Sequence, residues 1–438
     1  MPVQTRIPAL SLLLLALPLA SLAQTVTTGP DPVLPEPGTR LLPDMTIPRP
    51  ALWEGAMPIV PEGYQIAAIA TDLKIPRQML VLPNGDILVA EGKGQSAPVM
   101  RPKDLIAGMI KGLGKSPEPG GNRLTLLRDA DGDGTYELQT IFAGDLNSPY
   151  GLAYVEGSIF VANQDAVVRF AYSDGQTEAT GLPETLALLP SALNHHWTKA
   201  MTVSSDGRFL YVGIGSNSNI TERGIPAEED RAMVWEISTE TGAHRPFATG
   251  LRNPTALTIQ EGTDRLWAVV NERDEIGPDL VPDYLTSVQD GGFYGWPYSY
   301  WGQNIDTRVY PQDPEKVASA LAPDYALGAH VAALGVDFSS PAMGPAFAEG
   351  AFVGMHGSWN RKDPVGYKVV FVPFSGGMPS GEPVDVVTGF LVDSKTTRGR
   401  PVGVTVDPRG ALLVADDLSN TIWRVTPDDG ASGPAPAP

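Results

Sequence analysis

The 438-residue sequence contains no cysteine. This absence excludes disulfides, thiolate metal sites, iron–sulfur clusters, covalently attached c-type haem and cysteine nucleophiles. Positive charge is also scarce, because 31 lysines and arginines stand against 50 aspartates and glutamates, a formal net charge of −19 at pH 7. An acidic surface repels phosphate backbones and anionic lipid, so we exclude nucleic-acid binding.

No apolar run at the N-terminus is long enough to span a membrane. Arg6 is the only charge before SLLLLALPLA, which is shorter than a transmembrane helix requires. Ala23 then offers the small residue that precedes the cut in export signals. We predict a cleaved signal peptide over residues 1–23 rather than a membrane anchor, and therefore a periplasmic or secreted protein.

Helical periodicity is rare, whereas one β pattern recurs along the chain. A short apolar strand ends in a polar turn, commonly with glycine, and a second apolar strand follows with alternating hydrophobicity. The copies are QMLVLPNGDILVAE, YGLAYVEGSIFVAN, AMTVSSDGRFLYVGIG, TALTIQEGTDRLWAVVNE, FAEGAFVGMHGSW and VGVTVDPRGALLVADD. Six such hairpins predict an all-β fold, a six-bladed β-propeller, in preference to a pair of β-sandwiches.

The two ends of the chain differ in composition from this repeat region. Proline is dense over residues 24–60, and repeated proline blocks helices and central strands, so we expect an extended lead that lies over the main domain. The propeller is expected over residues 61–427. Residues 428–438, DDGASGPAPAP, are expected to form a disordered tail.

Two of the five histidines, His195 and His196, are neighbours in NHHWTKAM. They precede a predicted strand, and successive side chains of extended backbone point to opposite sides, so one of the two should face the channel. For an isolated pair, a hydrogen-bonded loop histidine is the simpler interpretation. Other polar residues at equivalent places favour a functional one.

Cations and amides recur at the entries to predicted strands and in one polar loop. They are Arg252 and Asn253 in GLRNP, His330 in GAHVA, His356 and Arg361 in MHGSWNR, and Arg398 and Arg400 in TTRGRPVGV. Scattered surface cations would explain each one alone. Their repeated placement in an acidic chain favours a central site for an anionic ligand.

Two further segments are rich in acids. DADGDGTYE places Asp129, Asp131 and Asp133 at alternate positions, as in a calcium loop, but Thr140 stands where an EF-hand needs glutamate. A structural calcium turn and a solvated hairpin turn both remain open. In residues 271–302, acids precede a cluster of aromatics that suits flat rings and sugars, and long loops of this kind are commonly functional.

The joint order of several motifs resembles one family. NHHWTKAM, GLRNP, NERDEIGPDLVPDY, GGFYGWPYSYWG, HGSWNR, GYKVVFVPF and GRPVGV followed by LLVADD resemble the pyrroloquinoline quinone (PQQ)-dependent sugar dehydrogenases, and most closely their sorbosone-dehydrogenase-like branch. The resemblance covers about Pro61 to Pro427. It implies a six-bladed propeller that binds PQQ and calcium and oxidises an aldose, sorbosone or a related sugar aldehyde or alcohol.

The resemblance also implies residue roles. His196 matches the base that takes the sugar hydroxyl proton, Arg252 the arginine that polarises the quinone oxygen, and Asn253 a cofactor-holding residue. PQQ carries three carboxylates, and the cations expected to meet the cofactor are Arg77, Lys199, His330, His356, Arg361, Arg398 and Arg400.

Calcium is held largely by backbone oxygens in the resembled glucose enzymes, and the matching stretch is Arg273 to Asp279. Asp274 and Asp279 are therefore metal candidates, beside the three aspartates of the turn. One departure concerns the base: Ser216 stands where the family has an aspartate that orients the histidine. Another acid, such as Glu229, is a candidate substitute.

Since the chain cannot carry covalent haem, electrons must leave to a separate acceptor, for which we expect a basic cytochrome c or a quinone. Two other functions fit a propeller: a calcium-dependent hydrolase such as a lactonase, and a non-catalytic binding protein. Only the dehydrogenase needs His196, Arg252 and Arg400 together.

Overall fold

The computed structural model describes residues 27–38, 45–94, 101–102, 105, 108–109 and 112–428. The predicted signal peptide and all but the first residue of the predicted tail lie outside these residues. Strands far outnumber helices in the described chain, which confirms the all-β prediction. Within it, no helix combines the length and the apolar character that crossing a membrane requires.

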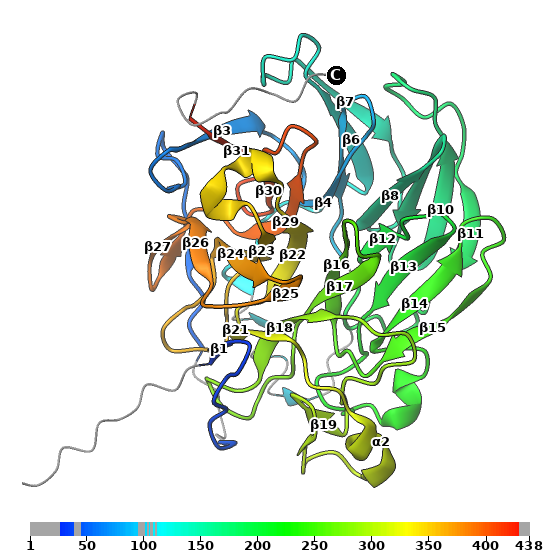
Figure 1. The fold of residues 1–438 in the computed structure, drawn as a ribbon, viewed down its shortest axis with the longest axis vertical. Coiled ribbons are helices and arrows are strands. Elements are labelled where there is room, and N and C mark those ends of the chain that lie inside the picture. The colour runs from blue at the N-terminus through cyan, green and yellow to red at the C-terminus, as the bar shows by residue number, and fades with distance from the viewer. Residues whose placement is uncertain are drawn as a thin grey trace, which may run out of the picture.

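Most strands of the described chain belong to six sheets of four or five strands (Figure 1). The first contains β4 (Pro76–Val81), β5 (Ile87–Glu91), β6 (Arg123–Arg128) and β7 (Leu138–Ala143). The second contains β8 (Gly151–Val155), β9 (Ser158–Ala162), β10 (Ala166–Ala171) and β11 (Glu184–Leu188). The third contains β12 (Met201–Val203), β13 (Phe209–Ile214), β14 (Met233–Ser238) and β15 (His244–Thr249).

The remaining three sheets include strands from distant parts of the chain. The fourth contains β16 (Pro254–Gln260), β17 (Arg265–Val270), β18 (Pro282–Ser287), β21 (Tyr325–Ala329) and β1 (Thr28–Gly29). The fifth contains β22 (Ala333–Phe338), β23 (Gly350–Met355), β24 (Lys368–Ser375), β25 (Met378–Pro379) and β26 (Val384–Val387). The sixth contains β29 (Pro401–Val406), β30 (Leu412–Asp416), β31 (Thr421–Pro427) and β3 (Tyr64–Ala70).

The remaining strands form two smaller sheets. β19 (Ser299–Tyr300) pairs with β20 (Asn304–Ile305), and β2 (Arg49–Pro50), β28 (Thr396–Thr397) and β27 (Leu391–Asp393) form a short sheet. The helical segments of the described chain include α2 (Pro314–Ser319) and three 3₁₀ turns at Ile225–Glu228, Pro341–Met343 and Pro345–Phe347.

The hairpins form where the sequence places polar glycine turns between apolar runs. Gly85, in the turn between β4 and β5, has φ 89°, and Gly207, between β12 and β13, has φ 72°. Side chains at such φ values are strained, and glycine has none, so these positions set the turns. Five of the six predicted hairpin units therefore appear as strand pairs. The prediction is wrong for FAEGAFVGMHGSW, which contains only β23, because the segment before that strand forms a 3₁₀ turn and β23 pairs with the earlier β22.

We call β4, β8, β12, β16, β22 and β29 the first strands of the six sheets. These strands contact one another in a closed circuit. β4 contacts β8, and the contacts continue through β12, β16, β22 and β29 back to β4. Neighbouring first strands also begin side by side: Gly151 N donates to Lys199 O (3.1 Å), and Thr255 Oγ1 donates to Ala333 O (2.6 Å). Residues just before these strands therefore gather at one end of the circuit.

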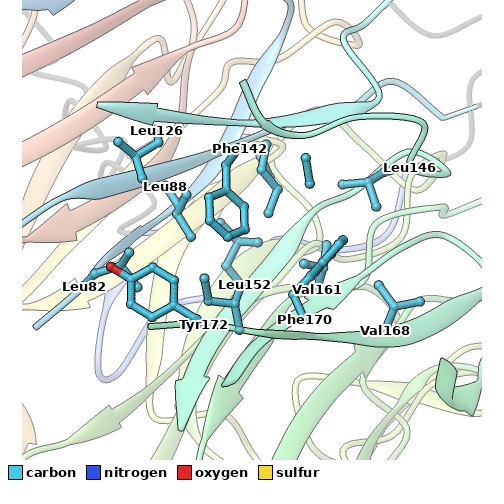
Figure 2. Close-up of a cluster of buried hydrophobic side chains, with 14 of the residues drawn as sticks. Leu82, Leu88, Leu126, Phe142, Leu146, Leu152, Val161, Val168, Phe170 and Tyr172 are labelled. Atoms are coloured by element: carbon cyan, nitrogen blue, oxygen red, sulfur yellow. The ribbon is translucent and has the colours of Figure 1, made fainter. Parts of the chain in front are cut away.

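Apolar side chains pack between adjacent sheets. Figure 2 shows one cluster, in which Leu88 and Leu126 of the first sheet meet Leu152 and Val161 of the second. Both faces of these inner strands are covered, which explains why their apolar residues run nearly continuously. Each fully buried side chain of this size contributes about 1.5–3 kcal/mol.

The sixth sheet joins strands that lie far apart in the sequence. β3 pairs antiparallel with β31, with Tyr64 opposite Pro427. Part of the predicted lead also rests on the sheets, because Arg49 pairs with Thr396 and Trp53 packs edge-on against Trp423.

Candidate active site

The polar residues singled out from the sequence lie at or just before the first strands. His196 precedes β12, Arg252 and Asn253 precede β16, His330 precedes β22, and Arg400 precedes β29; Arg77 is the second residue of β4. The strand starts share one end of the circuit, so the fold brings these residues to a common region.

His196 is fixed by Ser216 on the neighbouring strand connection. Its Nδ1 atom lies 2.8 Å from Ser216 O and 3.0 Å from Ser216 Oγ. The serine hydroxyl donates to Ser218 O (2.6 Å), so the carbonyl of Ser216 is the acceptor that assigns the hydrogen to Nδ1. Nε2 is then left with its lone pair, the form of histidine that accepts a proton.

The charge state of His196 follows from its surroundings. Burial, and then the positive charge of Arg252, hold the pKa of His196 well below 6.5. The imidazole is therefore neutral at neutral pH. His195 packs edge-on against it, with ring centroids 4.7 Å apart.

An acid supports the two residues after Ser216, and it is Glu228 rather than Glu229. Glu228 accepts from Asn217 N (2.6 Å) and from the hydroxyl of Ser218. It reaches the loop from the 3₁₀ turn Ile225–Glu228, whereas Glu229 follows as the cap of that turn. Burial raises the pKa of Glu228. The carboxylate thus holds residues 216–218 without contacting His196 itself.

Two buried basic side chains, Lys199 and Arg231, hold the histidine loop, residues 194–199. Lys199 Nζ donates to Asn194 Oδ1 (2.9 Å) and Trp197 O (3.0 Å), and its side chain is fully buried. Arg231 donates to Asn194 Oδ1 (3.3 Å) and His196 O (3.0 Å). Lys199, expected from sequence to meet the cofactor, thus has its ammonium group bonded within its own loop.

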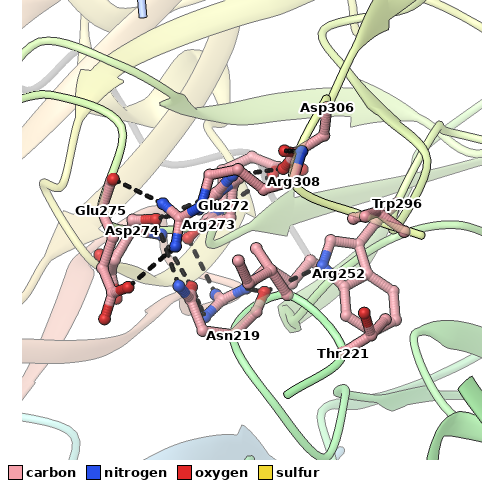
Figure 3. Close-up of polar contacts among 12 residues, drawn as sticks. Asn219, Thr221, Arg252, Glu272, Arg273, Asp274, Glu275, Trp296, Asp306 and Arg308 are labelled. Carbon is pink, nitrogen blue, oxygen red and sulfur yellow. Dashed lines mark hydrogen bonds and ion pairs between the residues drawn. The ribbon is translucent and has the colours of Figure 1, made fainter. Parts of the chain in front are cut away.

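Arg252 sits in a network of backbone and amide oxygens, shown in Figure 3. Its Nε donates to Asn219 O (3.1 Å), Nη1 to Asn271 O (3.1 Å) and Glu272 O (2.8 Å), and Nη2 to Asn219 Oδ1 (3.0 Å). Four of its five N–H groups are therefore used, and one on Nη2 remains. Asn219 also accepts from Asp274 N (2.8 Å) and Trp296 Nε1 (3.1 Å).

Asn253 lies beside His196 across a glycine. A Cβ atom added at Gly215 would lie 2.2 Å from Asn253 Oδ1 and 2.6 Å from His196 Cβ, so only glycine allows this approach. Asn253 Oδ1 is buried and has no hydrogen-bond partner within the described chain. Burial raises the pKa of Glu272, whose backbone carbonyl accepts from Arg252, to about 7.

A second cluster surrounds Asp417, immediately after β30. Asp417 Oδ2 accepts from Arg77 Nη1 (2.8 Å), and His356 Nε2 lies 3.1 Å from Oδ1. Burial would raise the pKa of Asp417, but His356, Arg77 and Arg400 lower it far below its usual range. Arg77 also lies over the ring of Trp197, at 5.3 Å, which connects this cluster to the histidine loop.

Arg400 and Arg398 carry unused donors. The guanidinium of Arg400 lies 5.9 Å from the ring of Tyr367, and that of Arg398 5.9 Å from Trp53. Among the described residues, the Nε atoms of both are buried without a hydrogen-bond partner. Such donors are costly to leave unpaired, which suits an anionic ligand that would accept from them.

The loop between β17 and β18 holds the two acids expected to bind metal. Asp274 Oδ1 accepts from Asn360 Nδ2 (2.7 Å) and lies 3.3 Å from His330 Nδ1. Asp279 Oδ1 accepts from Arg361 Nη2 (2.7 Å). Burial would lower the pKa of His330, but its hydrogen bond and ion pair with Asp274 raise it.

The three aspartates of the sequence motif lie elsewhere. They form the turn after β6, where they gather with Glu137 so that one ligand atom from each lies within 4.8 Å of the others. Asp129 accepts from Gly132 N (2.7 Å), Gly134 N (3.0 Å) and Arg409 Nη2 (3.0 Å). Because β6 runs with β4, its end lies away from the strand starts, so the fold does not bring this turn to the histidine region.

Comparison with known proteins identifies the family. A family model described as Glucose / Sorbosone dehydrogenase matches residues 73–358, more than half of the chain. The chain belongs to the glucose/sorbosone dehydrogenase family. A second model, described as TrAA12-like, matches residues 304–428. The resemblance predicted from the sequence motifs is therefore confirmed at family level.

Two curated relatives of this family member come from fungi. A pyrroloquinoline quinone-dependent pyranose dehydrogenase of Coprinopsis cinerea is 22% identical over 433 residues, covering 84% of this chain but only 54% of that protein. A pyrroloquinoline quinone-dependent sugar dehydrogenase of Hypocrea jecorina is 22% identical, covering 85% of this chain and 90% of that protein. This chain thus spans about half the length of the Coprinopsis cinerea protein.

Solved structures agree with the fold. The holo PQQ domain of the Coprinopsis cinerea pyranose dehydrogenase has a TM-score of 0.68 at 20% identity, covering 87% of this family member and 98% of that chain. The PQQ-bound aldose sugar dehydrogenase of Streptomyces coelicolor has a TM-score of 0.54 at 15% identity, covering 84% and 99%. At such identities the likeness establishes the fold.

Sequence reasoning missed several residues of this region. Asp417 was visible in the LLVADD motif, but its role depends on Arg77 and His356, which lie far away in sequence. Asn219 and Arg231 had no motif that marked them. Their function as hydrogen-bonding hubs is visible only in three dimensions.

Proposed function

We propose that this chain is an exported PQQ-dependent sugar dehydrogenase built on a six-bladed β-propeller, each of the six sheets being one blade. The observation that carries the proposal is the pairing of a neutral His196, whose Nδ1 is tied to Ser216 O at 2.8 Å, with the buried charge of Arg252. The family assignment and the names of the fungal relatives support the same activity.

The residues present fit PQQ, whose three carboxylates need cationic partners. The unpaired Nε donors of Arg400 and Arg398, with the unpaired Oδ1 of Asn253, are the groups that would hold it. Arg77, bound to Asp417 together with His356, adds positive charge nearby. When bound, PQQ supplies a quinone that accepts a hydride from the sugar carbon.

His196 would serve as the base in this reaction. Its Nε2 lone pair takes the proton of the sugar hydroxyl, and Ser216 O stabilises the resulting imidazolium through Nδ1–H. The remaining N–H of Arg252 would donate to a quinone oxygen, where negative charge develops. Ser216 thus takes the position of the aspartate through its backbone carbonyl.

We propose a sugar substrate, an aldose, sorbosone or a related aldehyde or alcohol. The electrons would pass to a separate acceptor, such as a basic cytochrome c or a quinone. Removing Arg6, the only charge in residues 1–23, changes the net charge from −19 to −20, which favours a basic partner. Loss of the signal peptide also fits a periplasmic or secreted location.

A calcium-dependent hydrolase would need carboxylates that converge freely on a metal. The acids of this region are instead paired with basic side chains: Asp279 with Arg361, and Asp417 with Arg77 and His356. This pairing favours the dehydrogenase.

The test uses the purified mature protein mixed with PQQ, with dye reduction followed over aldoses, sorbosone and simple alcohols. PQQ-dependent turnover that is lost in His196→Ala supports the proposal. A protein that binds no PQQ contradicts it. The mutant must keep its PQQ affinity, so that loss of turnover reports on the base.

A further inference from the structure

The loop at residues 273–279 is where calcium is expected, and its oxygen atoms already have cationic partners. Gly277 O lies 3.0 Å from His330 Nε2, and Pro278 O accepts from Arg361 Nη1. These two carbonyls lie in the stretch Arg273 to Asp279, where the sequence resemblance implies calcium binding. A Trichoderma reesei neighbour has itself been solved as a calcium structure.

The side chains of this loop are occupied in the same way. Asp274 Oδ1 faces His330 Nδ1 at 3.3 Å, and Asp279 Oδ1 accepts from Arg361 Nη2 at 2.7 Å. His330 therefore bridges one carboxylate and one carbonyl, and Arg361 bridges another such pair. Each cation joins a carboxylate to a backbone oxygen, as a bound metal would.

Arg361 acts as a donor only, because a guanidinium has no acceptor and keeps its positive charge. His330 lies in the same loop and is 6% exposed. A permanent positive charge and a buried imidazole thus fill the oxygen-lined loop.

A calcium ion does not fit this arrangement. It takes six to eight oxygen ligands at about 2.3–2.6 Å. It would have to displace both side chains from these oxygens or lie in contact with the guanidinium of Arg361, and like charges at such distances repel.

We propose that His330 and Arg361 replace calcium at this loop, so that the chain binds its quinone cofactor without a metal. This inference rests on the proposed PQQ site. The two side chains supply the positive charge and the loop closure that a metal would provide.

The decisive measurement is PQQ binding by the full chain, followed through tryptophan fluorescence, in excess EDTA and in excess calcium. We expect the two Kd values to agree within about twofold. A Kd that falls tenfold or more with calcium, about 1.4 kcal/mol, overturns the inference while leaving the proposed function in place. A chain that binds PQQ in neither solution overturns the proposed function.

The turn after β6 needs its own control, because Asp131 and Asp133 belong to an acidic cluster there. The double variant Asp131→Asn, Asp133→Asn removes calcium binding at that turn. In this background, calorimetric titration with calcium alone should give no binding heat. One calcium bound per chain, lost on further Asp274→Asn substitution, would show that the loop takes the metal and would overturn the inference.

Arg361 offers a matched series. Arg361→Gln frees Pro278 O and Asp279 from the guanidinium and should weaken PQQ binding in EDTA, with calcium restoring part of the affinity. Arg361→Lys keeps the charge and should stay indifferent to calcium. Arg409→Gln, which releases Asp129 at the distant turn, should leave PQQ binding unchanged. Wild-type PQQ affinity without calcium dependence in Arg361→Gln would contradict the assigned role.

Discussion

Ser216 contacts His196 twice through one atom: its carbonyl oxygen accepts from the backbone N of His196 (3.3 Å) and lies 2.8 Å from Nδ1 of the ring. A single carbonyl thereby sets both the position of the loop and the tautomer of the base. This arrangement needs no carboxylate in contact with the ring of His196. The arrangement keeps the imidazole neutral while leaving Nε2 available.

The first prediction concerns pH. Catalysis requires neutral His196, and burial with the charge of Arg252 holds its pKa well below 6.5. As pH falls, kcat/KM for the sugar should therefore stay level through pH 6.5 and decline only below it. Arg252→Gln removes one cause of the depression, so its acid limb should move to higher pH. A wild-type limb centred above 6.5 would contradict this account.

The second prediction concerns Glu228. Glu228→Gln weakens the acceptor for Asn217 N and Ser218 Oγ, which loosens the loop that orients His196. We expect kcat to fall about tenfold, roughly 1.4 kcal/mol, with KM little changed. The pH profile should shift as well, because the Nδ1 acceptor moves. Glu229→Gln is the matched control and should behave as wild type.

The third prediction separates two roles for Lys199. Its ammonium is buried and bonded to Asn194 and Trp197, so Lys199→Met should lower the free energy of unfolding by about 1–3 kcal/mol. Urea unfolding measures this. If Lys199 instead bound the cofactor, the variant would lose PQQ affinity and keep its stability. Lys368→Met, which removes a surface ion pair with Asp385, should cost about 0–1 kcal/mol.

The fourth prediction concerns Arg400. The Nε atom of its guanidinium is buried without a hydrogen-bond partner in the described chain, so Arg400→Gln should leave the unfolding free energy nearly unchanged. PQQ affinity should nevertheless fall tenfold or more, since a charge-assisted partner of a carboxylate is lost, about 1.5–3 kcal/mol. Isothermal titration with PQQ and urea unfolding on the same samples test both halves. A large loss of stability with unchanged affinity would reverse the interpretation.

Much of the fold could be predicted because its determinants are local. Alternating apolar residues and turn glycines such as Gly85 and Gly207 encode the hairpins directly in the sequence. The entries to first strands, where Arg252 and Arg400 lie, could likewise be located from the strands that follow them.

The supporting contacts could not be predicted because they join residues far apart in sequence. Arg77 meets Asp417 across 340 positions, and Arg361 meets Asp279 across 82. The sequence also cannot show which of two adjacent glutamates makes a contact. The 3₁₀ turn shows that Glu228, and not Glu229, accepts from Asn217 N. Sequence spacing carries no information about such pairings.

The pairing of β3 with β31 bears on how the molecule is made. The two strands come from opposite ends of the described chain, so the last sheet stays incomplete until the C-terminal strand has been synthesised. Contacts of such long sequence separation form late and slow the folding of β proteins. A nascent chain would therefore keep β3 without its partner strand until β31 emerges. Deletion of β31 should leave the edges of both β3 and β30 unpaired.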